Sequence, residues 1–385
     1  MGDCFITRRG GGKPSGLYVW KKYELILPYL SFIGNEDFTL KTNNTTKNWD
    51  GTLEYSTNKR AWNTWDGTEI SSSGNTLYLR GTGNTKIAGD SFDYRFVFTG
   101  TNSLKIACKG NIENLLDYET VSDGGHPTMA NYCYKYMFQG CTALTTAPAL
   151  PATTLTNSCY QYMFEGCTSL TTAPELPATT LAEGCYRYMF YSCTALTTAP
   201  ALPATILADY CYKYMFSGCT ALTTAPELPA TTLAEGCYQY MFSGCTALTT
   251  APALPATTLT NSCYQYMFSG CTALTTVPEL PATTLGNYCY YAMFNDCTSL
   301  TSVPELPATT LAEGCYQHMF NSCTKIKLST TQTGEYQTAY RIPTSGIGTT
   351  ATDALSNMFA NIGGTFTGTP EINTTYYLST SNTVV

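Results

Sequence analysis

Residues 237–259 read CYQYMFSGCTALTTAPALPATTL, and nearly the same line stands eight times in the chain. Its Cys-Tyr-x-x-Met-Phe signature recurs every 26 residues, at Cys133, Cys159, Cys185, Cys211, Cys237, Cys263, Cys289 and Cys315. A period of about 20–29 residues is typical of leucine-rich solenoids. One copy has too few large apolar side chains to offset the entropy lost on ordering it, so we expect the copies to stack.

Within one copy, the apolar positions predict a short helix followed by a short strand. Cys237, Met241 and Cys245 recur at i, i+4 and i+8, which would place them on one face of a helix. Gly244 suits the end of that helix, where a positive φ is often needed. Residues 248–251 then read as a strand, which the prolines that follow would end. The expected fold class is therefore an α+β repeat solenoid.

Four parts are expected along the chain. They are a flexible lead (1–16), a small all-β, sandwich-like domain (17–110), a leucine-rich repeat solenoid of about eight coils (111–328), and a degenerate coil with a C-terminal cap (329–385). Turn residues separate β-rich runs in the second part, which predicts strands at 17–23, 38–40, 52–55, 76–80 and 94–98. A short helix is expected at 110–116, leading into the repeats.

The chain has 18 cysteines, and all but Cys4 and Cys108 recur at alternating gaps of 8 and 18 residues. We interpret the recurring ones as stacked buried thiols, because a free cysteine behaves as a small hydrophobe. Disulfides and zinc are the alternatives. Zinc sites favour closely spaced cysteine pairs, and helical positions eight residues apart are separated by about 12 Å, too far for a disulfide within one copy. The predicted core thiols are Cys133, Cys141, Cys159, Cys167, Cys185, Cys193, Cys211, Cys219, Cys237, Cys245, Cys263, Cys271, Cys289, Cys297, Cys315 and Cys323.

Composition argues against several functional classes. The net charge is -7 and only 12% of residues are charged, without the basic stripe of a nucleic-acid-binding protein. The longest apolar runs are far below the ~18 residues needed to cross a membrane. The chain has two histidines, His126 and His318, which disfavours histidine-based catalysis and metal binding. We predict no catalytic residue, no metal and no cofactor.

The repeat array resembles the BspA-like leucine-rich repeats. The unit of that family carries Ala-Phe or Met-Phe, then Cys-x-x-Leu, then a short Leu-rich strand that ends in Pro. The first copy matches this order with Met137, Phe138, Cys141, Leu144, Leu150 and Pro151. The resemblance covers roughly residues 125–330, and Pro148, inside the strand, departs from it. The family is found on bacterial surface proteins and on proteins of gut bacteriophages, so the resemblance implies a role in adhesion.

Two columns of tyrosines would run along such a solenoid. Tyr134 and its equivalents are expected to flank the core as half-buried packing. The second column is expected to be more exposed, and either stacks on sugar rings or partner side chains or only packs the convex face. Its members are the predicted ligand-binding residues: Tyr136, Tyr162, Tyr188, Tyr214, Tyr240 and Tyr266.

These features predict a non-enzymatic adhesion or receptor-binding protein whose partner is a host-surface glycan or protein. Catalysis needs different polar groups that converge on one site, whereas identical coils repeat each group. The carboxylates of the β-rich domain (Asp50, Glu54, Asp66 and Glu69) show no spacing that marks a catalytic pair. A structural spacer or filament subunit is the alternative, since the exposed positions vary so little.

The expected location is a virion tail or an extracellular surface. Arg8 and Arg9 are not followed by an apolar stretch, so no secretory signal is expected. This favours a bacteriophage tail-associated protein over a bacterial cell-surface adhesin, and residues 16–22 also resemble the start of some phage tail-associated proteins. Residues 1–110 would contact other virion or filament proteins. Homo-oligomerisation stays open.

Overall fold

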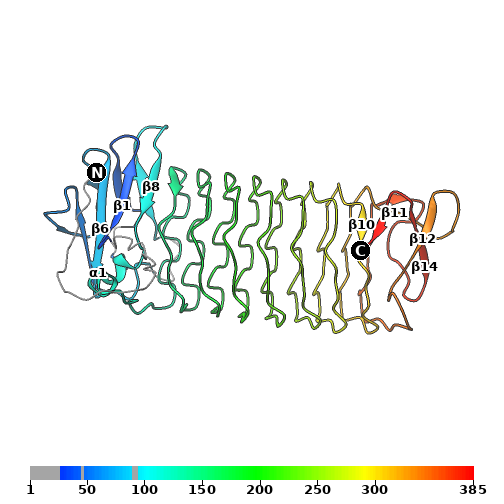
Figure 1. The fold of residues 1–385 in the computed structure, drawn as a ribbon. Helices are drawn as coiled ribbons and strands as arrows, with labels where there is room; N and C mark the ends of the chain where they lie inside the picture. The colour runs from blue at the N-terminus through cyan, green and yellow to red at the C-terminus, as the bar shows by residue number, and fades with distance from the viewer. Residues whose placement is uncertain (1–26, 45–46, 89–93) are drawn as a thin grey trace, which may run out of the picture.

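The computed structural model describes residues 27–44, 47–88 and 94–385. They form an elongated row of coils, with β-strands and a helix at the N-terminal end and a small sheet at the C-terminal end (Figure 1). The expected lead (1–16), the expected strand at 17–23 and Cys4 lie outside the described residues.

Two sheets precede the repeats. A six-stranded sheet has the order β4-β3-β6-β1-β8-β9, and a three-stranded sheet has the order β5-β2-β7. The strands predicted at 38–40, 52–55, 76–80 and 94–98 overlap β2, β3, β6 and β7. The strands of these sheets are β1 (Leu30–Gly34), β2 (Thr39–Thr42), β3 (Thr52–Ser56), β4 (Asn63–Trp65), β5 (Ile70–Ser71), β6 (Thr76–Thr82), β7 (Phe96–Thr99), β8 (Ile106–Lys109) and β9 (Leu144–Thr146).

The N-terminal sheets share a core with the first coil. Strand β9 belongs to that coil and pairs in parallel with β8, with Ile106 opposite Leu144. The ring of Phe138, the first phenylalanine of the repeats, lies 5.7 Å from Phe96 and 6.4 Å from Phe32. The sheets therefore cover the apolar end of the first coil, as a cap does in repeat proteins.

The helix α1 (Asn114–Ser122) packs against β6, near the lower end of the N-terminal strands in Figure 1. It starts four residues later than the helix expected at 110–116, and Asp117 interrupts it with φ -155° and ψ 99°. The carboxylate of Asp117 accepts hydrogen bonds from the N–H groups of Thr120 and Gly83, which ties the interruption to the loop after β6.

The expected helix within each repeat is wrong: consecutive turns take its place throughout the coils. In the first coil, the N–H of Met137 donates to Tyr134 three residues back, at 3.2 Å. The N–H of Phe138 instead donates to Met163 of the next coil, at 2.9 Å. The same alternation continues from coil to coil, so every second N–H group of this turn segment joins a neighbouring coil.

A left-handed residue at every fourth position produces this alternation. In the first coil Tyr132, Tyr136 and Gly140 have φ of 61°, 63° and 69°. Positive φ costs a non-glycine residue roughly 1–2 kcal/mol, which an isolated helix would avoid. The hydrogen bonds to the next coil offset that cost. The predicted positive φ of Gly244 is confirmed (74°), although it closes a turn and not a helix.

The expected strand of each repeat shrinks to single bridges in most coils. Thr250 pairs in parallel with Thr224 and with Thr276, its equivalents on the two neighbouring coils. A second row of bridges runs through positions such as Thr258 and Thr284. The prolines between the two rows remove N–H donors, which limits each pairing to one residue.

The C-terminal region closes the other end of the row. Strands β11 (Lys327–Ser329), β12 (Tyr336–Arg341), β13 (Gly363–Gly364) and β14 (Thr375–Ser379) form a sheet of order β12-β14-β11-β13. The last strand, β15 (Thr383–Val384), pairs in parallel with β10 (Ser302–Val303). The Asn382 amide nitrogen donates to both Thr301 and Lys325, at 3.0 Å each, so the tail joins two coils.

Candidate binding surface

The recurring cysteines line the interior of the coils as two columns of free thiols. All sixteen are buried, and Cys108 of the N-terminal sheet is buried and free as well. From the second coil on, the second cysteine donates its S–H to the carbonyl oxygen of a phenylalanine on the preceding coil, as Cys219 does to Phe190 at 3.1 Å. In the first coil, Cys141 donates instead to Phe96 of β7. Burial raises the pKa of the Cys193 thiol to about 12, which keeps it protonated and unreactive at neutral pH.

The inner tyrosine column is fully part of the core. Tyr134 and its equivalents are at most 1% exposed, so the expected half-burial was an underestimate. Their rings stack on one another with centroids 5.6–5.9 Å apart, beside a parallel column of phenylalanine rings at 5.5–5.7 Å. Identical rings at identical positions can pack flat in every coil, which explains why the repeats vary so little.

The outer tyrosine column contains the predicted ligand-binding residues. The structure brings Tyr136, Tyr162, Tyr188, Tyr214, Tyr240 and Tyr266 together as one stack, with neighbouring centroids 4.3–4.8 Å apart. They are less exposed than expected: Tyr136 is buried, and the other five are half-buried. Because each ring covers its neighbour, the column presents ring edges and hydroxyls, and the faces that would stack on a sugar are occupied. Burial raises the pKa of Tyr162 and that of Tyr266 to about 12.

The outer column changes character near the C-terminal end. Ala292 replaces the tyrosine there and is 1% exposed. The neighbouring Tyr291 covers that position, with its ring edge-on to Tyr266 at 5.1 Å and to His318 at 5.7 Å. We call the surface made by residues 209–218 and their equivalents in the other coils the tyrosine face.

Sequence reasoning missed the basic residues of the tyrosine face. They sit two residues after the buried cysteine, where the eight coils carry Lys135, Gln161, Arg187, Lys213, Gln239, Gln265, Tyr291 and Gln317. Arg187 lies 5.4 Å from the ring of Tyr188, and Lys213 lies 5.2 Å from Tyr210 and 5.8 Å from Tyr214. The available signal was this one position, where three coils carry a cation and four carry glutamine.

The opposite half of each coil forms the threonine–proline face, which we define as residues 223–232 and their equivalents. Its threonines are mostly exposed, and its leucines point into the core. Between the prolines, the exposed position alternates between Ala and Glu before ending in Glu279 and Glu305. A groove of about 650 Å³ runs between two coils here, lined by residues from Thr146 to Pro151 and from Thr172 to Pro177.

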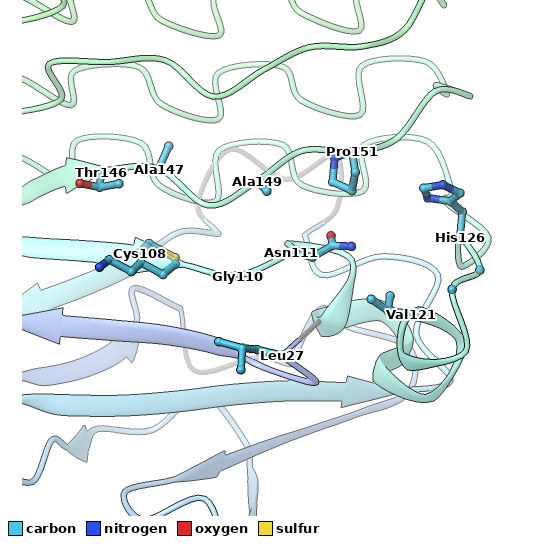
Figure 2. A pocket seen from close by; sticks show the side chains of 13 residues that line it. Leu27, Cys108, Gly110, Asn111, Val121, His126, Thr146, Ala147, Ala149 and Pro151 are labelled. Carbon is cyan, nitrogen blue, oxygen red and sulfur yellow. The ribbon is translucent and has the colours of Figure 1, made fainter. Parts of the chain in front are cut away.

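A second pocket, of about 620 Å³, lies where the N-terminal sheet and α1 meet the first coil. Figure 2 shows His126 and Pro151 at one end of it, and Cys108 and Thr146 at the other. Its lining is mostly backbone and apolar atoms. His126 points its Nδ1 at the buried Glu113 carboxylate, 2.8 Å away.

The carboxylates considered at the sequence level have structural partners. Glu54 pairs with Arg80 at 2.7 Å, and Glu69 with Lys41 at 3.6 Å. Asp50 and Asp66 accept the hydroxyls of Thr85 and Thr68, each at 2.6 Å. Across 27–44, 47–88 and 94–385, no group of three or more Cys, His, Asp or Glu residues could hold a metal ion.

Comparison with known proteins gives one match. The family described as BspA type leucine-rich repeat region, in six copies, matches residues 126–249 and 213–336, which together span more than half of the chain. No curated protein and no solved structure gave a significant match. In the described part of the chain, no helix is long and apolar enough to cross a membrane.

Proposed function

The chain belongs to the BspA-type leucine-rich repeat family, and on that premise we propose that it is a non-enzymatic adhesion protein. In this proposal the coils form one solenoid whose surface binds a glycan or protein on a host cell. Repeats of this family are commonly of the surface or adhesion type, and the proposal adds the presentation of a long, regular surface to a repetitive ligand.

The observation that carries the proposal is the repetition of each exposed group along the coils. A polar side chain of one kind recurs at the spacing of neighbouring coils, about 4.8 Å for paired strands. Catalysis needs the reverse, a few different groups held around one reacting atom. A surface with one period suits a ligand with a period of its own, such as a polysaccharide, which it can bind at several equivalent points.

Both faces offer groups that bind sugars or proteins. The tyrosine face presents phenol edges and hydroxyls together with amides and cations. The threonine–proline face presents exposed hydroxyls on either side of a shallow groove between coils. Tyrosine and arginine are enriched in protein interfaces, which favours the tyrosine face as the contact surface.

The test is retention of the folded chain on immobilised mucin, on cell-wall polysaccharide and on intact cells. We expect the native protein to be retained and a heat-unfolded sample to be lost. A matched variant, Glu175→Ala with Glu227→Ala, installs the residue that alternate coils already carry and should fold normally. If the folded protein is retained on none of the three supports, adhesion is refuted.

We further propose that the protein acts in a bacteriophage tail, with residues 1–110 contacting other virion proteins. The edge strand β4 supports this part, because a strand at a sheet edge has unpaired backbone groups and Asn63 and Thr64 on it are exposed. The alternative location is a bacterial cell surface. We expect mass spectrometry of purified virions to detect the chain. Its absence from virions would refute the phage-tail location and favour the bacterial cell surface.

A structural spacer or filament subunit is the second candidate function. The near identity of the exposed residues favours it, because a spacer needs length and stability but no particular ligand. A spacer would fail the retention test and yet remain in assembled particles or filaments. The two functions therefore separate in the same pair of experiments.

A further inference from the structure

Two neighbouring coils on the tyrosine face carry a cation where most other coils carry glutamine. Arg187 and Lys213 occupy equivalent positions, and the N–H of Tyr188 donates to the carbonyl of Lys213 at 2.9 Å. This hydrogen bond places the backbones of the two residues side by side on neighbouring coils, about 4.8 Å apart, which is the spacing of paired strands. The equivalents Gln161, Gln239, Gln265 and Gln317 show that the fold itself does not need a positive charge here.

The two cations have aromatic neighbours but no carboxylate partner among the described residues. The ion pairs found there join Lys41 to Glu69, Arg80 to Glu54, His126 to Glu113 and Lys327 to Glu335. The Nε atom of Arg187 is buried and has no hydrogen-bond partner. A buried donor without a partner destabilises the folded chain, and a bound acceptor would remove that cost.

A second buried atom on the same row also lacks a partner. It is Oε1 of Gln239, one coil beyond Lys213, and it is an acceptor. The amide nitrogen of Gln239 donates to Gln265, so the oxygen is the part of this side chain that remains without a partner. Arg187, Lys213 and Gln239 thus form a row of donor, cation and acceptor about 10 Å long.

Burial and the charge of Arg187 lower the pKa of Lys213 from its ordinary value. Two like charges held together in a half-buried place repel each other, and an anion between them removes that repulsion. A ligand that suits this row would place an anionic group between Arg187 and Lys213. It would also donate a hydroxyl hydrogen bond to the side-chain oxygen of Gln239.

We infer that Arg187, Lys213 and Gln239 form a binding subsite for an acidic saccharide, one that carries a sulfate or carboxylate group beside free hydroxyls. This inference rests on the proposed adhesive function and names its ligand class. A saccharide fits better than a nucleic acid, because a net charge of -7 with only two adjacent cations would repel a long polyanion. Neighbouring carboxylates reinforce the limit: Glu235 accepts the Tyr210 hydroxyl at 2.5 Å, and Asp209 accepts the N–H of Glu235 at 3.0 Å.

The experiment titrates the full chain with sulfated dextran oligosaccharide, oligogalacturonate and neutral dextran oligosaccharide by calorimetry at 0.15 M salt. The test variants are Arg187→Gln, Lys213→Gln and both together, each of which installs a residue found at the same position of other coils. We expect each single variant to weaken binding of at least one acidic oligosaccharide about tenfold, because charged hydrogen bonds are lost, and the double variant to weaken it further.

The matched control is Lys41→Gln with Lys327→Gln, which makes the same change in net charge away from the tyrosine face. It should leave the affinity unchanged, and circular dichroism should show the same folded spectrum in all variants. Equal weakening in control and test variants would overturn the subsite, as would binding of neither acidic oligosaccharide. If neutral dextran alone binds, and the variants do not affect that binding, the subsite is refuted while adhesion stands. A parallel titration with oligo-dT tests a nucleic acid as the ligand. Tighter binding of oligo-dT than of either acidic oligosaccharide would overturn the saccharide subsite.

Discussion

The two halves of each coil hold the stack together to very different degrees. On the tyrosine face the coil that starts at Cys211 donates four N–H groups to the next coil, from Tyr212, Tyr214, Phe216 and Gly218, at 2.8–3.0 Å. On the threonine–proline face the same coil meets the next one through a single bridge, Thr224 to Thr250. The hydrogen bonds between coils are thus concentrated on the tyrosine face.

Alkaline pH should lower the stability of the chain more than any other change, because the buried titratable groups lie beside the tyrosine face. The pKa of Cys193 rises from an ordinary 9.0 to about 12 in the folded chain through burial. Above pH 9 the unfolded chain releases this proton and the folded chain keeps it, so the free energy of unfolding falls as pH rises toward 12. Each such thiol contributes a slope of about 1.4 kcal/mol per pH unit.

Guanidinium unfolding followed from pH 7 to pH 11 measures this loss. We expect a steady midpoint below pH 9 and a steep decline above it. Replacing Cys193 and Cys245 by alanine should reduce the slope, since both have a pKa of about 12. A midpoint that stays flat up to pH 11 would mean that the thiols are not held in the neutral form by burial.

Removing one ring from the aromatic columns should cost the most of any single substitution. Phe216 is fully buried, with Phe190 and Phe242 stacked on its two sides at 5.6 and 5.7 Å. Phe216→Ala should lower the free energy of unfolding by about 3–5 kcal/mol, because it leaves a cavity between two coils. Urea unfolding measures the change, and a loss below 1 kcal/mol would show that the coils do not pack as one core.

The repeat and its apolar residues could be predicted from the sequence, but the backbone conformation of each coil could not. Cys237, Met241 and Cys245 recur every fourth residue, which fits an α-helix and fits equally a row of four-residue turns. The difference lies in where alternate N–H groups donate, and that depends on a neighbouring coil that a local pattern does not represent. Tyr240 at a positive φ of 57° was therefore not predictable from propensity.

The surface was harder to predict than the core for a related reason. The six outer tyrosines were found as a column, but their exposure depends on the distance between coils, which allows Tyr214 and Tyr240 to stack at 4.3 Å. The row of Arg187, Lys213 and Gln239 was overlooked because three unlike residues give no motif. Only the repeat frame shows that they occupy one position, and only the structure shows which of their atoms lack partners.

The thiol hydrogen bonds between coils allow a smaller and sharper test. Cys219 donates its S–H to the Phe190 carbonyl at 3.1 Å and is fully buried. Cys219→Ala removes one weak hydrogen bond and one sulfur atom, so we expect a loss of about 1–2 kcal/mol in urea unfolding. In the native wild type, iodoacetamide at pH 8 should leave the thiols of the coils unmodified, and rapid labelling would contradict their burial.

The smallest effect is expected on the threonine–proline face. Thr250 bridges Thr224 and Thr276 through its backbone, and its side chain is exposed, so Thr250→Ala should change the free energy of unfolding by less than about 0.5 kcal/mol. The matched variant is Tyr240→Ala on the other face of the same repeat; Ala292 shows that alanine fits that backbone at a φ of 50°. Tyr240→Ala loses stacking on two rings and should cost clearly more. Equal costs in urea unfolding would mean that both faces hold the coils together equally, and that stability is not concentrated on the tyrosine face.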